Sequence, residues 1–186
     1  MQFNCNATRL AVIDIFGLFS LYDLDAAVSG AADGGYIATE RKDVWCMVWA
    51  SDKPETIALM EKNRLYVMHG AEAEEAVLTS GYICQLKELV TKTILLEDIM
   101  QSPEQLKNIG SMIQEFETKA LKDTREYLGQ SAPSKKERLA YVEDKAHPRL
   151  WQLMAENALD KLDLTTAELA FVKAKDYRGV LFVSKV

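Results

Sequence analysis

The sequence has few of the features that mark membrane, secreted or disulfide-rich proteins. No run approaches the roughly 20 apolar residues of a membrane-spanning helix, so no transmembrane segment is expected. The first residues, MQFNCNATRLAVIDIF, lack the charged, apolar and small-residue order of a secretory signal. Cysteines are scarce, odd in number and far apart: Cys5, Cys46 and Cys84. They fit reduced, buried thiols better than a disulfide framework.

A basic patch is also missing. The net charge is −6, and residues 1–97 hold 8 Lys and Arg against 14 Asp and Glu, while residues 98–186 hold 14 of each. Binding nucleic acid needs clustered cations that displace counterions, so a nucleic-acid partner is not expected. A solvated acidic rim is the simplest interpretation of the first half.

Motifs for catalysis, cofactors and metals are absent as well. Gly34-Gly35 lacks the strand, helix and lysine of a phosphate-binding loop, and two histidines without paired cysteines do not form a zinc site. Cys46 or Cys84 could be imagined beside His69 or His147 as a thiol–imidazole pair. Both cysteines fall in alternating strands, however, where burial is the better interpretation. We expect no enzyme, no cofactor and no metal.

The first half has the pattern of short strands. Apolar and β-branched runs separated by turn residues predict strands at 9–15, 18–24, 43–50, 56–60, 65–68, 77–78 and 82–86, with a flexible loop over 27–35. Residues 43–50 are apolar on both faces, which predicts burial on both sides and places Trp45 and Trp49 in the core.

Residues 43–81 form one four-strand unit of roughly 40 residues, the period of a propeller blade. A β-sandwich gives similar strand spacing, so it remains an alternative. The Gly-His and Trp-Asp dipeptides typical of WD repeats are missing, and LYDLD at residues 21–25 occupies the place of a Trp-Asp dipeptide.

The second half changes to helical spacing. Ser102-Pro103 predicts a helix start, followed by one apolar face at Leu106, Ile109, Ile113, Phe116 and Ala120 and an end at Gly129. Capping boxes are predicted at 134–137 and 165–168, and His147-Pro148 opens another helix.

Trp151 and Phe171 are the large core residues expected for these helices, and small residues between them allow close helix approach. Stacked helix pairs of an α-solenoid show this alternation, although a single helical hairpin remains an alternative. The content is α+β, and we expect three regions: strands over 1–97, a helical linker over 98–146 and solenoid repeats over 147–186.

Four segments together carry a family resemblance: CNATRLAVIDIFGLFSLYDLD (5–25), ERKDVWCMVWASDKPETIALMEKNRLYV (40–67), TSGYICQL (79–86) and the HPRLW…LDL…AE.AFV…KDY.G..FV framework after residue 147. In this order they are similar to the WD repeat-containing protein 35 family, the WD-repeat subunit of intraflagellar transport complex A. Cys46 stands where a polar residue is expected, a local departure from the family pattern.

The resemblance implies the last blades of a WD-repeat β-propeller, followed by the start of a TPR-like α-solenoid. It implies a non-enzymatic scaffold that assembles with other complex A subunits. Such a scaffold supports retrograde ciliary transport, cilium assembly and, indirectly, the passage of membrane proteins into cilia. The implied location is the cytoplasm, the ciliary base and the axoneme. A coatomer-like propeller–solenoid vesicle coat is the alternative, because it shares the architecture.

The same resemblance implies that the 186 residues are a fragment of a longer product. An incomplete propeller leaves unpaired strand edges, and a solenoid stopped after about one repeat lacks its stacking neighbour. We therefore expect the isolated chain to associate or aggregate.

Overall fold

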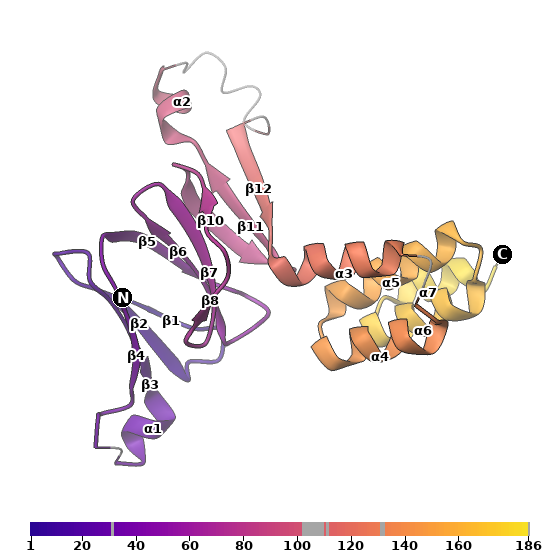
Figure 1. The fold of residues 1–186 in the computed structure, drawn as a ribbon, viewed down its shortest axis with the longest axis horizontal. Coiled ribbons are helices and arrows are strands. Elements are labelled where there is room, and N and C mark those ends of the chain that lie inside the picture. The colour runs from indigo at the N-terminus through magenta and orange to yellow at the C-terminus, as the bar shows by residue number, and fades with distance from the viewer. Residues whose placement is uncertain (31, 102–109, 111, 131–132, 186) are drawn as a thin grey trace. The chain divides into compact units, whose positions relative to one another are not determined.

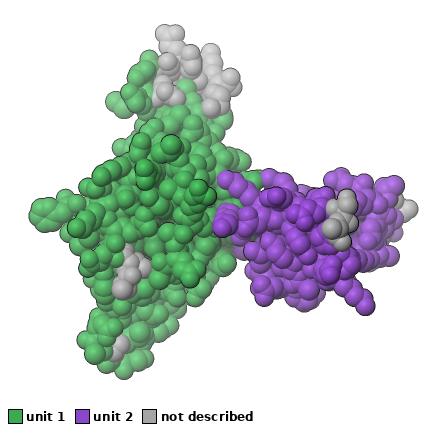
Figure 2. All heavy atoms as spheres, viewed as in Figure 1, with its two compact units in different colours: residues 1–118 green, residues 119–186 purple. Residues whose placement is uncertain are grey.

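The computed structural model describes residues 1–30, 32–101, 110, 112–130 and 133–185 (Figure 1). The chain divides into two compact units, Met1–Thr118 and Lys119–Val186, coloured green and purple in Figure 2. The first unit is built from strands and the second from helices, so the content is α+β.

Where the structure describes unit 1, its strands form three antiparallel sheets that follow one another along the chain (Figure 1). The first sheet has the order β1 (Gln2–Phe3), β2 (Arg9–Ile13), β3 (Phe19–Asp23), β4 (Tyr36–Arg41), with helix α1 (Leu24–Val28) before β4. The second has β5 (Val44–Trp49), β6 (Thr56–Glu61) and β7 (Arg64–His69), with the short strands β8 (Glu72–Ala73) and β9 (Val77–Leu78) both pairing with β7. The third has β10 (Tyr82–Lys87), β11 (Val90–Ile94) and β12 (Ile113–Glu117), and α2 (Leu96–Gln101) follows β11.

The first strands of successive sheets lie beside one another, as in propeller blades. Ala50, directly after β5, forms a parallel bridge with Leu86 of β10, and the Ser51 amide donates to the Leu86 carbonyl at 3.1 Å. The Trp49 indole donates to the Gln2 carbonyl at 3.1 Å and connects β5 to β1. The unit predicted over 43–81 is one sheet, but it has five strands instead of four, because both short strands β8 and β9 pair with β7.

Among the described residues of unit 1, two hydrophobic cores lie between adjacent sheets, and β6 contributes to both. Ile57 and Leu59 lie in the core shared with the first sheet, among residues such as Phe19. Ala58 and Met60 point the other way, into the core shared with β10. Strand side chains alternate between faces, so this strand contributes to the packing of the second sheet against both of its neighbours.

The described residues of unit 2 form five short helices: α3 (Lys119–Gly129), α4 (Lys135–Lys145), α5 (Pro148–Asp160), α6 (Leu164–Ala174) and α7 (Tyr177–Val183). The predicted capping box opens α4: the Glu137 amide donates to Ser134 Oγ, and the Ser134 amide donates to Glu137 Oε2 at 2.7 Å. The predicted start at His147 also occurs, with its Nδ1 accepting from the Arg149 amide at 3.1 Å.

The helices pack through small residues. Ala155, Ala167 and Ala170 are fully buried, beside Trp151 and Phe171, which are 5% and 8% exposed. Gly179 of α7 lies so close to the Phe171 ring that a Cβ there would come within 2.3 Å of Cδ1.

The helix predicted from Ser102 to Gly129 is wrong in its middle. Leu106 and Ile109 lie outside the described residues, but Ile113–Glu117 is strand β12, paired with β11 from Ile94↔Ile113 to Val90↔Glu117. Pairing with a distant β-branched strand overrides the local helical spacing. The strand unit therefore extends to Thr118 instead of ending at residue 97, and the 98–146 linker is divided between both units.

Trp45 is not a core residue, which corrects the prediction. It is 40% exposed, with its indole nitrogen donating to the Lys62 carbonyl at 2.8 Å and its ring 4.8 Å from that of Tyr82. The pairing of β5 with β6 shifts register between Val44 and Cys46, so Trp45 occupies an irregularity. A bulge redirects a side chain away from simple alternation. Trp49, by contrast, is 8% exposed.

Replacing Trp151 by alanine should lower the free energy of unfolding of unit 2 by about 3–5 kcal/mol, the usual cost of removing a buried aromatic side chain. Chemical denaturation followed by circular dichroism measures it. Tyr177→Ala is the matched control, because Tyr177 is 78% exposed. Equal losses in both variants would contradict the packing described here.

Gly179→Ala should destabilise the chain although alanine is the better helix former by about 1 kcal/mol. The added methyl group would overlap the Phe171 ring. Gly129→Ala, where nothing lies within 4 Å of the added Cβ, should be neutral or stabilising. A higher melting temperature for Gly179→Ala would show that the ring moves aside at no cost.

Candidate functional site

The thiol–imidazole pair considered from the sequence does not form: Cys46 and Cys84 each contact a backbone carbonyl, not a histidine. Cys46 Sγ lies 4.0 Å from the Ile83 carbonyl, and burial raises the pKa of its thiol, which disfavours a reactive thiolate. Cys84 is exposed, and its Sγ lies 3.6 Å from the Tyr82 carbonyl instead of beside a histidine. Cys5 is exposed too, so the prediction of buried thiols is wrong for Cys5 and Cys84.

His69 joins a chain of polar groups across the second sheet. Its Nδ1 lies 2.9 Å from Thr56 Oγ1 and its Nε2 lies 2.8 Å from Glu74 Oε1. Hydroxyl, imidazole and carboxylate occur in the same order in nucleophilic triads. Thr56 is only 1% exposed, so its hydroxyl is not accessible to a substrate. These hydrogen bonds instead connect β6, β7 and the segment after β8.

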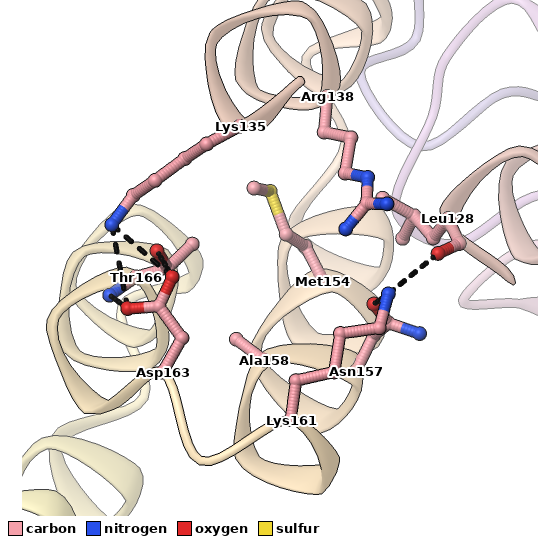
Figure 3. A pocket seen from close by; sticks show the side chains of 9 residues that line it. All are labelled: Leu128, Lys135, Arg138, Met154, Asn157, Ala158, Lys161, Asp163 and Thr166. Atoms are coloured by element: carbon pink, nitrogen blue, oxygen red, sulfur yellow. Dashed lines mark hydrogen bonds and ion pairs between the residues drawn. The ribbon is translucent and has the colours of Figure 1, made fainter. Parts of the chain in front are cut away.

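The remaining candidate is a cavity in unit 2, of about 50 Å³, lined by residues of α3, α4, α5 and the start of α6 (Figure 3). Three cations face it: Lys135 and Arg138 from α4, and Lys161 after α5. Asp163 is the acidic residue of the lining. Figure 3 shows Met154 rising between the Lys135–Asp163 side and the Arg138–Lys161 side.

On one side of the cavity, Asp163 caps α6. Its carboxylate accepts from the Thr166 amide at 3.1 Å and from the hydroxyl of Thr166, from the Thr165 hydroxyl at 2.8 Å and from Lys135 Nζ at 3.2 Å. The hydroxyls of Thr166 and Thr165 hold the pKa of Asp163 well below its usual range. The capping box predicted at Thr165 is therefore wrong: the N-cap is Asp163, and the threonine hydroxyls serve it.

On the other side, two cations bind the C-terminal end of α3. Lys161 Nζ donates to the Leu128 carbonyl at 3.1 Å and to Asn157 Oδ1 at 2.8 Å. Arg138 Nη2 donates to the Gln130 carbonyl at 2.7 Å. Cations at a helix C-terminus satisfy its unpaired carbonyls and oppose its dipole.

Sequence reasoning did not single out this cavity. Its signals are weak ones: Lys135 and Arg138 three residues apart on one helix, and Lys161 two residues before the capping Asp163. Such spacings are common on solvated helices, and only the packing of four helices gives them a shared location. Within the described residues there is no group of three or more potential metal-ligating side chains. In the same part of the chain, no helix is long and apolar enough to cross a bilayer.

Comparison with known proteins agrees with the arrangement of sheets. Residues 1–117 match the family model described as the WDR35 second beta-propeller, which ends where β12 ends. The chain belongs to the WD repeat-containing protein 35 family. Its sheets are thus part of a propeller, and the helices follow it.

Curated relatives extend the similarity through the helices. WD repeat-containing protein 35 of Rattus norvegicus is 44% identical over 193 residues, covering 100% of this chain and 16% of the relative. The Mus musculus protein is 44% identical over 190 residues, covering 98% and 16%, and the Homo sapiens protein 44% over 184 residues, covering 97% and 15%. The chain therefore spans only about a sixth of the length of these relatives.

Replacing Asp163 by alanine should cost about 0.5–2 kcal/mol at neutral pH, the range for losing an N-cap. The folded-state pKa of Asp163 is depressed, so its contribution is complete above the unfolded value of about 4 and is lost as the pH falls further. The stability difference between wild type and Asp163→Ala should therefore shrink in acid. Urea titrations at several pH values measure it.

Asp160→Ala is the matched control, because this exposed aspartate ends α5 and caps no helix. Its removal near a helix C-terminus should not weaken the fold. A pH-independent loss for Asp163→Ala would show that the carboxylate charge does not contribute.

Proposed function

We propose that this chain acts as part of a non-enzymatic scaffold subunit of intraflagellar transport complex A. The observation that carries the proposal is the 44% identity that extends through both units, because it preserves the succession of propeller and helical repeats, not one module alone. Propellers and solenoids bind other proteins through extended preformed surfaces. Its partners are the other subunits of complex A, with membrane-protein cargo bound indirectly.

The scaffold works in the cytoplasm, at the ciliary base and along the axoneme. There it supports retrograde transport, cilium assembly and the passage of membrane proteins into cilia. Architecture alone would equally suit a vesicle coat, and fold likeness carries no function by itself. The family match favours complex A over a coat.

A chimera tests the proposal. The matching segment of the Mus musculus relative is replaced by this chain, and the tagged chimera is expressed in ciliated cells that lack the relative. We expect it to copurify complex A subunits in mass spectrometry and to restore cilia and retrograde movement. A chimera that lacks the helical unit, residues 119–186, is the comparison for loss of function.

The chimera must first be soluble and of the expected mass, so that a folding failure is recognised. A folded chimera that copurifies vesicle-coat subunits, or that gathers no complex A subunit, would contradict the proposed function.

A further inference from the structure

The turn between β2 and β3 exposes two adjacent large apolar side chains. Ile15 is 93% exposed and Phe16 is 83% exposed. The turns at the opposite end of the first two sheets read NCNAT (4–8) and SDKPE (51–55), without a large aliphatic or aromatic residue. Single exposed apolar residues are normal on a protein surface, but adjacent ones mark a candidate interaction site.

The geometry of the turn does not require these two residues. The Gly17 amide donates to the Asp14 carbonyl at 3.1 Å, and Asp14 Oδ1 accepts from the amides of Phe16 at 2.8 Å and Leu18 at 2.7 Å. Aspartate in the first position and glycine in the fourth are typical of a type I turn, whose two central positions accept most residues. Ile15 and Phe16 occupy those central positions, so local structure gives no reason for their apolar character.

The turn is anchored to the second sheet. The Val44 amide donates to the Gly17 carbonyl at 2.9 Å, and a Cβ on Gly17 would come within 3.3 Å of Asp43 Cα. The neighbouring sheet is thus in place on this side of the turn and still leaves Ile15 and Phe16 uncovered. A preformed loop loses less conformational entropy on binding than a flexible one, which suits a docking element.

The chain that links β4 to β5 places an unpaired cation next to the same anchor. Arg41 pairs with Glu61 at 2.9 Å and Asp43 pairs with Lys62 at 3.1 Å. Lys42, between them, is exposed and has no ion pair with any residue that the structure describes. The surroundings of the apolar tip are therefore complementary to a carboxylate on a partner.

We propose that the Ile15–Phe16 turn docks into an apolar pocket of a partner protein, with Lys42 paired to a carboxylate at the rim of that pocket. A protruding tip needs a concave partner, and a few large apolar anchors commonly carry most of the binding energy of an interface. The charge pair at the rim sets the orientation of the partner. The identity of the partner rests on the proposed function, because we expect it among the subunits of complex A.

Photocrosslinking in the chimera described above tests the site. The photoreactive residue p-benzoylphenylalanine replaces Phe16, and in a matched control it replaces Val28, which is 89% exposed but lies in α1. Irradiation should join position 16 to one complex A subunit, within a segment that combines apolar and acidic residues, as mapped by mass spectrometry. Position 28 should give at least fivefold less of this product.

Charge variants test the contact at the rim. Lys42→Glu should lower the yield of the position-16 crosslink at least threefold, because it places two carboxylates opposite each other. Lys122→Glu, the same change at an exposed lysine of α3, should leave the yield unchanged. Limited proteolysis of each purified chimera, compared with the unchanged chimera, establishes that the variants are folded.

Four results would overturn the assignment. A crosslink from position 16 to the chimera's own chain would mean that another part of the long chain covers the turn, and a phospholipid adduct would mean insertion into a bilayer. Equal yields from positions 16 and 28 would mean non-specific contact. No product at position 16, in a chimera that copurifies complex A subunits, would mean that the tip stays in solvent.

The proposed function is tested separately by the unchanged chimera. If that chimera recovers no complex A subunit while position 16 still crosslinks another protein and the yield depends on Lys42, only the ciliary proposal fails. If position 16 then crosslinks nothing, both proposals fail. Equal yields from Lys42→Glu and Lys122→Glu would contradict the carboxylate at the rim.

Discussion

The two-sided burial of β6 is the constraint on which unit 1 depends. Ile57 and Leu59 fill one core, Ala58 and Met60 the other, and all four are fully buried. Burying a large aliphatic side chain stabilises a fold by about 1.5–3 kcal/mol, and a slip of one residue would exchange the two sets. Among the described residues, the buried side chains of the second sheet are thus divided between two cores, and each core is completed by a neighbouring sheet.

Short-range sequence patterns correctly predicted the features that depend only on neighbouring residues. Alternating apolar residues located β5, β6 and β7, and the cap residues Ser134 and His147 located two helix starts. Alternation misplaced Trp45 and Cys84 because both stand at register shifts of their strands. A bulge depends on how a strand pairs with its partner, and the sequence of one strand alone does not specify that pairing.

Non-local competition explains the other errors. The spacing of Ile113, Phe116 and Ala120 satisfies a helix, yet β11 offers the same segment a partner with matching register. At the start of α6 two local solutions competed, a threonine box and an aspartate cap, and Asp163 prevails because both threonine hydroxyls and Lys135 converge on it. The cavity could not be predicted from the sequence for the same reason, because its lining residues come from four different helices.

The two units differ in their charge. Residues 1–118 hold 9 Lys and Arg against 18 Asp and Glu, and residues 119–186 hold 13 against 10, so the helical unit is the cationic part of an acidic chain. Two of these cations, Arg138 and Lys161, donate to backbone carbonyls at the C-terminal end of α3. Because both contacts depend on the charge of these two side chains, added salt should weaken them together.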